Sequence, residues 1–243
     1  MRNARLWRTL LGVEKTVVEA VELDEEMGVL VARVRPTGAM RNRCGVCRRR
    51  CPRYDRGGGR RRWRSLDSGS IRVELEADAP RVSCRDHGVT VAAVPWARHQ
   101  AGHTHLFDAQ VAWLATQTSK TAVTELMRIA WRTVGAIITR VWNDTGKLQD
   151  PFAGLVRIGI DEISYKRGHK YLTVVVDHSS GRLVWAAPGR DTATLAKFFD
   201  LLGPERAALI THVSADGADW IAKAVVDYCP NAVRCADPFH VVR

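Results

Sequence analysis

Residues 155–177 read LVRIGIDEISYKRGHKYLTVVVD, two runs of mostly apolar and β-branched residues on either side of a basic segment that contains Gly168. Such runs, bounded by turn residues, are typical of strands buried inside a sheet, so we expect strands at 155–161 and 171–177. The first run ends on Asp161. Because an ionised carboxylate is costly to bury without a partner, this aspartate is a candidate functional residue.

Strand and helix patterns alternate through the rest of the second half of the chain. After a turn at 179–181 we expect, in order, a strand at 183–187, a helix at 192–202 with Asp191 as its N-cap, a strand at 208–215, a helix at 218–228 and a strand at 232–236. The order strand–strand–strand–helix–strand–helix–strand is that of an RNase H-like domain. In that fold one acidic residue lies on the first strand and a second just after the fourth, which matches Asp161 and Asp216.

Two aspartates therefore form a candidate metal site. If the strands that carry them are adjacent, Asp161 and Asp216 lie at the same edge of the sheet, where paired carboxylates can bind Mg²⁺ or Mn²⁺ and polarise a phosphodiester. Asp219 is an alternative to Asp216, although it falls inside the next predicted helix. We interpret the other aspartates of this region as capping or turn residues.

The composition is that of a globular protein with excess positive charge. Of 243 residues, 46% are hydrophobic and 26% are charged, which excludes the disordered, collagen-like and disulfide-scaffold classes. No apolar run approaches the roughly 18 residues that span a bilayer, and the basic N-terminus lacks the apolar core of a signal peptide. We therefore expect a cytoplasmic protein with no membrane partner. The 37 Lys and Arg against 26 Asp and Glu give a net charge of +11, which favours a nucleic-acid partner.

The positive charge is concentrated between residues 41 and 64. This stretch holds eleven arginines and one acidic residue, Asp55, around the three glycines 57–59, so we expect an arginine-rich loop. Guanidinium groups bind phosphates through paired hydrogen bonds, so the loop is a candidate DNA-binding surface. The arginines that we predict to contact DNA here are Arg48, Arg49, Arg50, Arg60, Arg61 and Arg62.

Four residues around this stretch have the spacing of a zinc site. Cys44 and Cys47 form one Cys-x2-Cys pair, and Cys84 and His87 form a Cys-x2-His pair further on. Two such pairs, each on one turn, suit tetrahedral Zn²⁺, and the metal would stabilise a small β-rich domain with little core of its own. Cys51 is an alternative ligand, but it would leave the second pair unexplained. Cys229 and Cys235 have no predicted role.

The remaining strands of this β-rich part and the helices after it follow from periodicity. We expect a hairpin from 15–23 and 28–34, strands at 70–75 and 81–83, and helices between 106 and 142. Segments 121–127 and 131–138 have the proportions of a helix-turn-helix, with Ile129 filling the turn. This pattern is equally compatible with a plain helical core. If it binds DNA, the residues available to the groove or to phosphates are Arg128, Arg132, Thr133 and Arg140.

These observations predict an α+β multidomain protein. We expect a small β-rich zinc-binding and DNA-binding domain at 1–100, a helix-turn-helix segment with a linker at 101–150, and an incomplete α/β RNase H-like domain at 151–243.

The chain resembles the bacterial insertion-sequence transposases of the ISL-three family, with matching features in order from about Leu10 to the last residue. The segments that carry the resemblance are 44–47 (CGVC), 63–67 (WRSLD), 81–84 (RVSC), 94–97 (VPWA), 158–162 (IGIDE), 168–171 (GHKY), 229–232 (CPNA) and 237–240 (DPFH). The resemblance implies an N-terminal zinc-binding domain, a helix-turn-helix and an RNase H-like DDE domain that cuts and joins DNA with Mg²⁺ or Mn²⁺.

The resemblance also implies roles for single residues. Asp161 matches the first catalytic aspartate and Asp216 the second, while Asp237 and His240 match an Asp/Cys-x2-His element near the active site of related transposases. Gly217 stands where a methionine usually follows the second aspartate. The third carboxylate of the family, a glutamate on a helix after the fifth strand, has no counterpart.

The expected function is therefore that of an insertion-sequence transposase, in which this chain is an N-terminal fragment that is catalytically incomplete alone. We expect it to bind the terminal inverted repeats of double-stranded DNA as a homo-oligomer, and so to associate with the nucleoid. The alternative is a DNA-binding regulator or inhibitor of transposition that lacks enzyme activity. A further alternative, an unrelated RNase H-like nuclease, predicts cleavage without strand joining.

Overall fold

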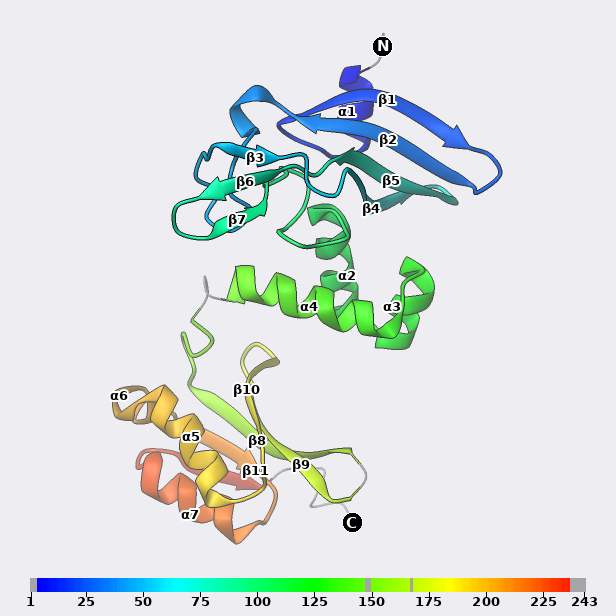
Figure 1. Ribbon diagram of the computed structural model, residues 1–243. Helices are drawn as coiled ribbons and strands as arrows, with labels where there is room; N and C mark the ends of the chain where they lie inside the picture. Colours follow the sequence, from blue (N-terminus) through cyan, green and yellow to red (C-terminus); the bar gives the residue numbers. More distant parts are fainter. Residues whose placement is uncertain (1–3, 147–149, 167, 237–243) are drawn as a thin grey trace. The chain divides into compact units, whose positions relative to one another are not determined.

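The computed structural model describes residues 4–146, 150–166 and 168–236. The chain divides into two compact units, Met1–Lys147 and Leu148–Arg243 (Figure 1). The division falls close to the predicted boundary at residue 150, and a further boundary at residue 100 stays a prediction. Within the described residues, no helix is long and apolar enough to cross a membrane.

The first unit begins with two small β-sheets. After helix α1 (Ala4–Leu10), strands β1 (Thr16–Asp24) and β2 (Val29–Pro36) form the predicted antiparallel hairpin. The remaining elements of this region are the 3-10 helix η1 (Gly38–Met40), β3 (Arg53–Asp55), β4 (Arg60–Ser68), β5 (Ile71–Asp78), β6 (Arg81–Cys84) and β7 (Gly88–Val91). The sheet orders are β1-β2-β5-β4 and β3-β6-β7, with β2 and β5 parallel.

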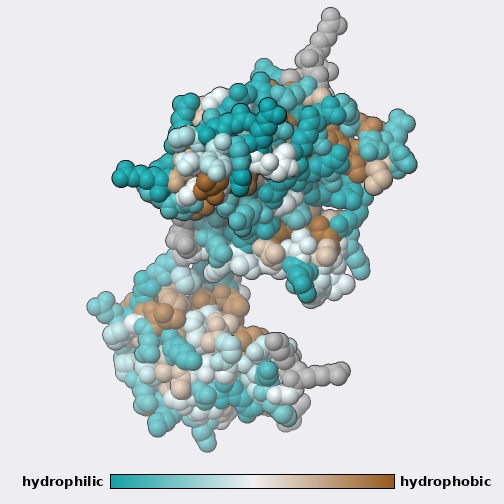
Figure 2. Space-filling model, viewed as in Figure 1, coloured by the Kyte–Doolittle hydropathy of each residue, from teal (hydrophilic) through white to brown (hydrophobic). Residues whose placement is uncertain are grey.

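An apolar core lies against the four-stranded sheet. Alternate residues of β5 are buried, as expected for a strand with one face in a core, whereas three consecutive residues of β4, Trp63–Ser65, are buried. Trp63 of β4 and Trp96 of the loop after β7 meet edge to face, with ring centroids 5.5 Å apart. Hydrophilic residues cover most of this unit's face that is visible in Figure 2.

Three helices complete the first unit and confirm the predicted helical segment. They are α2 (His105–Gln117), α3 (Lys120–Met127) and α4 (Trp131–Thr145). The side chains of Thr104 and Ser119 cap α2 and α3 by accepting hydrogen bonds from backbone N–H groups of their first turns. Helix α3 ends at Met127, and its C-cap residue Arg128, with a φ of 52°, turns the chain toward α4. The helices pack through Phe107, Val111, Val123, Val134 and Ile137.

The second unit contains a five-stranded mixed sheet and three helices. Its elements are β8 (Arg157–Lys166), β9 (Lys170–Asp177), β10 (Arg182–Pro188), α5 (Thr192–Leu202), α6 (Pro204–Ala207), β11 (His212–Ala215), α7 (Asp219–Tyr228) and β12 (Val233–Ala236). The sheet order is β10-β9-β8-β11-β12, with β8 antiparallel to β9 and parallel to β11. The predicted fold class is confirmed, including the strand–helix order of the RNase H-like domain.

Two local predictions for this unit need correction. The strand predicted at 208–215 begins only at His212, because Pro204 starts the short helix α6 and Ala207 and Ile210 turn into the core. Strand β8 extends past the predicted end at Asp161 to Lys166, where it pairs with β9 in a long hairpin. The N-cap prediction is confirmed, since the Asp191 carboxylate accepts a hydrogen bond from the Thr194 N–H at 2.7 Å.

The core of the second unit decides which residues lie on which face of the sheet. Ile158 and Ile160 of β8 are buried in the same cluster as residues of α5 and α7. Because neighbouring residues of a strand point to opposite faces, Gly159 and Asp161 belong to the other face. A Cβ at Gly159 would lie 2.8 Å from Nε2 of His178 and 2.9 Å from a methyl of Val176, so the close packing on this face requires glycine.

Candidate metal-binding and DNA-binding sites

The four predicted zinc ligands come together in the first unit. Cys84 ends β6, and Cys44, Cys47 and His87 lie in the turns beside it; their ligand atoms all lie within 4.8 Å of one another. The Sγ atoms of Cys47 and Cys84 are 3.7 Å apart, and Nδ1 of His87 lies 3.5 Å from Cys84 Sγ and 3.8 Å from Cys44 Sγ. Ligands of a tetrahedral ion with bonds of about 2.0–2.3 Å stand about 3.3–3.8 Å apart, so the cluster fits zinc.

Local backbone contacts shape the first pair of ligands. The Cys44 N–H donates to the Arg49 carbonyl at 2.8 Å, and the Arg48 N–H donates to the Cys44 carbonyl at 3.0 Å. Hydrogen bonding by His87 helps to lower the pKa of the Cys84 thiol to about 6. A thiol that ionises readily is suited to metal binding, because the thiolate is the ligand form. The donor set and its geometry therefore support a structural zinc.

Cys51 lies beside this cluster but outside the group of four. Its thiol donates to the Arg49 carbonyl at 3.4 Å. The pKa of Cys51 is raised by burial and by the neighbouring Cys84 thiol, but the pKa of Cys47 is raised as well, so position distinguishes the two cysteines. The geometry therefore favours Cys44, Cys47, Cys84 and His87 over any set that includes Cys51.

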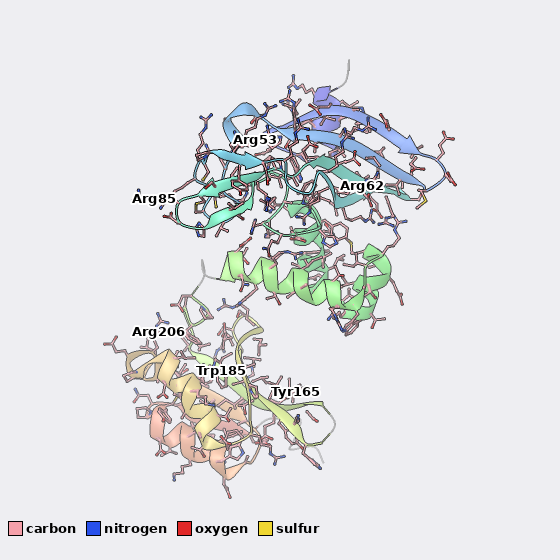
Figure 3. All side chains as sticks on the ribbon, in the orientation of Figure 1. Arg53, Arg62, Arg85, Tyr165, Trp185 and Arg206 are labelled. Carbon is pink, nitrogen blue, oxygen red and sulfur yellow. The ribbon has the colours of Figure 1, made fainter. Side chains whose placement is uncertain are left out.

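The arginine-rich stretch is only partly a loop. Arg60, Arg61 and Arg62 lie on strand β4 and not in the predicted loop; Figure 3 labels Arg62 on this strand. Arg60 binds Glu76 at 2.9 Å, and Arg62 binds Glu76 at 3.0 Å and Glu74 at 3.3 Å. Both glutamates lie on the neighbouring strand β5. The sheet therefore places acidic residues beside a basic stretch that contains one acidic residue.

The other arginines predicted to contact DNA differ in their surroundings. Arg61 donates to the Ala101 carbonyl at 2.7 Å, Arg48 donates to the Val94 carbonyl at 3.3 Å, and Arg49 binds Asp86 at 2.6 Å. Arg50 and Arg132 are exposed, the latter in the first turn of α4. Their DNA contacts remain predictions, as do those of the ion-paired arginines, which keep a large exposed fraction: 61% for Arg60 and 53% for Arg62.

Arg128 has an intramolecular role at the turn between α3 and α4. Its guanidinium donates to the Asp67 carboxylate and, at 3.2 Å, to the Ser70 carbonyl, both at the β4–β5 turn. Ile129 packs partly buried against the helical core, which confirms that it fills the turn. The helix-turn-helix is therefore joined to the β-rich part by side-chain contacts.

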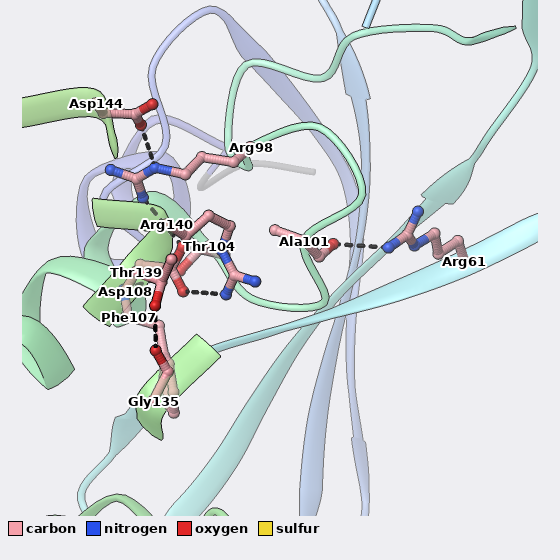
Figure 4. A network of polar contacts seen from close by, with 10 residues as sticks. All are labelled: Arg61, Arg98, Ala101, Thr104, Phe107, Asp108, Gly135, Thr139, Arg140 and Asp144. Carbon is pink, nitrogen blue, oxygen red and sulfur yellow. Dashed lines mark hydrogen bonds and ion pairs between the residues drawn. The ribbon is translucent and has the colours of Figure 1, made fainter. Parts of the chain in front are cut away.

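A buried ion network, shown in Figure 4, fixes the helices to the loop before them. Asp108 of α2 is fully buried and accepts hydrogen bonds from Arg98 at 3.1 Å and from two nitrogens of Arg140 at 3.1 Å each. Arg98 also binds Asp144 near the end of α4. The prediction that Arg140 is available to DNA is wrong, because its guanidinium is held by a buried carboxylate. Sequence reasoning missed Asp108, since its partners are distant in the chain.

The two candidate catalytic aspartates occupy neighbouring positions in the second unit. Strands β8 and β11 are parallel with Ile160 opposite Ala215, and Asp161 and Asp216 each follow directly. Adjacent strands lie about 4.8 Å apart, so the two residues stand side by side at the end of β11. The Asp161 carboxylate accepts from the Glu162 N–H at 2.7 Å, and that of Asp216 accepts from the Ala218 N–H at 3.1 Å.

Glu162 is an acidic neighbour of this pair that sequence reasoning did not assign. Burial raises its pKa, Arg190 opposes the rise through an ion pair at 3.0 Å, and the charges of Asp216 and Asp161 add to it. Asp219, the alternative second ligand, is exposed and begins α7. Asp237 and His240 lie outside the described residues.

A Cys/His cluster on a small β-sheet, a helix-turn-helix and a mixed sheet with two neighbouring aspartates are the parts of a DNA transposase with an RNase H-like domain. Three family models match the chain in this order. Residues 41–87 match the zinc-finger of transposase IS204/IS1001/IS1096/IS1165, residues 92–142 match the helix-turn-helix domain of transposase family ISL3, and residues 158–243 match an ISL3 family model described as transposase. The chain belongs to the ISL3 family of insertion-sequence transposases.

Curated relatives agree with this assignment. The chain is 67% identical over 247 residues to the transposase for insertion sequence element IS1557 of Mycobacterium tuberculosis, in strains CDC 1551 and H37Rv, which covers 100% of this chain and 56% of the relative. It is 28% identical over 244 residues to the transposase for insertion sequence element IS1001 of Bordetella parapertussis, covering 59% of that protein. The chain thus spans little more than half the length of the curated relatives it matches.

One match among solved structures is distant. A chain in the crystal structure of a pre-cleavage Mos1 transpososome matches 52% of this chain and 58% of its own length. The identity is 15% and the TM-score is 0.23, a similarity too low to carry a structural conclusion.

Proposed function

We propose that this chain binds the terminal inverted repeats of an insertion sequence as double-stranded DNA, and that it supplies the first two carboxylates of the catalytic site that cuts and joins DNA in a full-length transposase. The neighbouring positions of Asp161 and Asp216 on parallel strands are the observation that best supports it. Its site of action is the cytoplasm, on the nucleoid, where it acts as a homo-oligomer.

The catalytic part of the proposal rests on carboxylate chemistry. Asp161 and Asp216 would hold Mg²⁺ or Mn²⁺, because hard divalent cations prefer carboxylate oxygens. The bound metal would stabilise the attacking and leaving oxygens of an in-line phosphoryl displacement. Asp237 and His240 keep a proposed auxiliary role near these residues. The whole reaction is proposed for a longer chain such as the curated relatives, of which this chain spans 56–59%.

The DNA-binding part of the proposal rests on charge and on the helix-turn-helix. The zinc domain (1–100) and the helix-turn-helix segment (101–150) would bind the element ends, and 151–243 would form the catalytic domain. Phosphate contacts would come from Arg48, Arg49, Arg50, Arg60, Arg61, Arg62 and Arg132, while Arg128 would contribute only if it leaves Asp67. Exposed guanidinium groups on a chain of net charge +11 suit a polyanion.

Mn²⁺ binding to the purified chain, followed by electron paramagnetic resonance, tests the metal site. We expect Asp161→Asn and Asp216→Asn each to weaken Mn²⁺ binding by about tenfold or more, because each removes one of two charged ligands. Asp219→Asn is the matched control and should bind Mn²⁺ as the unmodified chain does. Equal binding by all three variants would remove Asp161 and Asp216 from the site, and loss only in Asp219→Asn would transfer the second ligand to Asp219.

Duplex binding by the same preparations tests the DNA-binding part. The affinity for a duplex that carries an element end should fall steeply as salt rises, because phosphate contacts release counterions. A comparison with a scrambled duplex then measures specificity. A flat salt profile or equal affinity for both duplexes would contradict the proposal.

A further inference from the structure

An open groove lies at the far end of the β8–β9 hairpin in the second unit. It has a volume of about 560 Å³ and is lined by Tyr165, His169, Lys170, Tyr171, Gly189 and Arg190, among others. Figure 3 labels Tyr165 on this hairpin. Among the described lining residues two carry positive charge and none is acidic, so the groove suits an anion with a flat apolar part.

The floor of the groove is held by the backbone. The Gly189 N–H donates to the Tyr171 carbonyl at 3.0 Å, and the Thr173 hydroxyl donates to the Gly189 carbonyl at 2.9 Å. Gly189 has a φ of 128°, and a Cβ there would collide with the Thr194 side chain of α5. The end of β10 is thereby pinned to β9, so the groove exists before any ligand binds.

Planar groups stack along this floor. The Arg190 guanidinium lies over the Tyr171 ring, 4.7 Å from its centroid, and the His169 ring lies within 28° of parallel to the same ring at 6.4 Å. Nucleic-acid bases stack on tyrosine rings and on guanidinium planes, whichever base is present. In a paired duplex these faces are covered by neighbouring base pairs, so the fitting ligand is an unpaired nucleotide.

The groove and the candidate catalytic aspartate Asp161 both lie along strand β8. The Arg190 guanidinium that covers Tyr171 binds Glu162 at 3.0 Å, next to Asp161 in the chain. Tyr165 is four residues beyond Asp161 on β8, a span of about 13 Å at the rise of a β-strand. Because Asp161 and Glu162 point to opposite faces of β8, a DNA strand with a phosphate at Asp161 would reach the groove by passing the end of the hairpin near Tyr165, a distance of a few nucleotides.

We propose that this groove binds an unpaired nucleotide of the DNA strand close to the phosphate that is cut, with its base stacked in the His169, Tyr171 and Arg190 set and its phosphate bound by Lys170. The inference rests on the proposed function, because it assigns a substrate subsite to the same catalytic domain. It predicts that this protein prefers DNA ends that are frayed or single-stranded over fully paired ends.

The test compares two DNA probes with the full chain, a blunt duplex and the same duplex with a thymidine tail of about ten nucleotides. Fluorescence anisotropy measures both affinities in a buffer without Mg²⁺, Mn²⁺ or any chelator, so that the structural zinc stays bound, and their ratio reports the tail alone. We expect the tail to strengthen binding about tenfold in the unmodified chain, since stacking on an aromatic side chain contributes at this level for a single base. Tyr171→Leu should bring the ratio close to one.

Matched variants distinguish the effects of the Tyr171 ring and the Lys170 charge from the effect of removing a positive charge elsewhere on the surface. Tyr171→Phe keeps the ring and should keep the ratio, whereas Lys170→Ala should lower it about fivefold. Lys197→Ala removes the same charge from the exposed surface of α5 and should leave the ratio unchanged. If circular dichroism shows that Tyr171→Leu does not fold, the comparison of Lys170→Ala with Lys197→Ala tests the inference instead.

Photocrosslinking locates the tail. With 5-iodouracil in place of thymine, we expect the crosslinked peptide to contain Tyr165 or Tyr171, at lower yield in Lys170→Ala than in Lys197→Ala. A ratio near one in the unmodified chain, or crosslinks confined to the first unit, would overturn the inference while duplex binding stands. Failure of the blunt duplex to bind would instead overturn the proposed function.

Discussion

Arg128, in the turn of the helix-turn-helix, donates to Asp67 of strand β4, which lies 61 residues earlier in the chain. Asp67 also binds Arg64, whose side chain is only 7% exposed, at 2.5 Å. One carboxylate thus serves a surface arginine of the helical segment and a buried arginine of the sheet. Burial lowers the pKa of Arg64, which makes its charged form dependent on Asp67.

Loss of Asp67 should therefore destabilise the first unit more than loss of Arg128. We expect Asp67→Asn to lower the free energy of unfolding by about 2–3 kcal/mol, because it leaves a buried guanidinium without its counter-charge. Arg128→Ala should cost less than about 1 kcal/mol, as for an exposed ion pair. Urea unfolding measures both, and equal losses would show that Arg64 does not depend on Asp67.

The Asp108 network should contribute more stability than any surface pair. Asp108→Asn removes the charge that Arg98 and Arg140 share, and breaking a buried ion pair costs about 3–5 kcal/mol. Asp144→Asn, which affects the exposed end of the same network, is the control and should cost less than about 1 kcal/mol. If the two variants unfold at the same urea concentration, the buried network does not stabilise the helices.

Acid should weaken the first unit through two half-buried histidines. Burial lowers the pKa of His103 and His105, against ordinary values of about 6.5. The unfolded chain then binds protons at a pH where the folded chain does not, so stability is complete above about pH 6.5 and falls as the pH drops below it. Each imidazole contributes up to about 1.4 kcal/mol per pH unit.

Unfolding of His103→Gln and His105→Gln, measured between about pH 7.5 and about pH 5.5, tests whether these two histidines cause the loss of stability in acid. Each variant should show a shallower pH dependence than the unmodified chain. Zinc content must be measured alongside, because acid also releases metal from thiolate ligands. A pH dependence that disappears only when zinc is lost would assign it to the metal cluster.

Zinc should be bound by the full chain at about one ion per chain. Cys44→Ser and Cys84→Ser should abolish binding and unfold the β3-β6-β7 sheet, because the metal replaces a core that this small sheet lacks. Cys51→Ser should retain the metal. Metal analysis together with hydrogen exchange of residues 81–91 distinguishes these outcomes, and zinc loss in Cys51→Ser alone would change the ligand set.

The pairing of β4 with β5 should also restrain DNA binding. Glu76→Gln removes the charged partner of Arg60 and one of the two carboxylates that bind Arg62; burial raises the pKa of Glu76, but the hydrogen bonds from these arginines outweigh it and lower the pKa. We expect tighter duplex binding and a salt slope steeper by about one unit, because a guanidinium is released to a phosphate. Arg62→Ala should do the opposite, and no change in either variant would exclude β4 from the DNA interface.

Much of the architecture could be read from local patterns. The cysteine and histidine spacing predicted a cluster whose atoms do meet, since two residues between ligands leave both on one turn. Apolar periodicity predicted α5 at its observed bounds, and the strand–helix order indicated an RNase H-like domain in which Asp161 and Asp216 lie at neighbouring strands, as β8 and β11 are. The predicted strand boundary was wrong where the short helix α6 interrupts an apolar run.

By itself, then, the sequence determined the class of the fold, the metal-binding cluster and the two aspartates, because each depends on residues close together in the chain or on the order of whole elements. Only the tertiary structure decided which charges are paired. The glutamates opposite Arg60 and Arg62, the arginines around Asp108 and the link from Arg190 to Glu162 all come from segments distant in the chain. Charge neutralisation acts through space, so a basic stretch of sequence becomes a DNA-binding surface only to the extent that folding leaves its charges exposed.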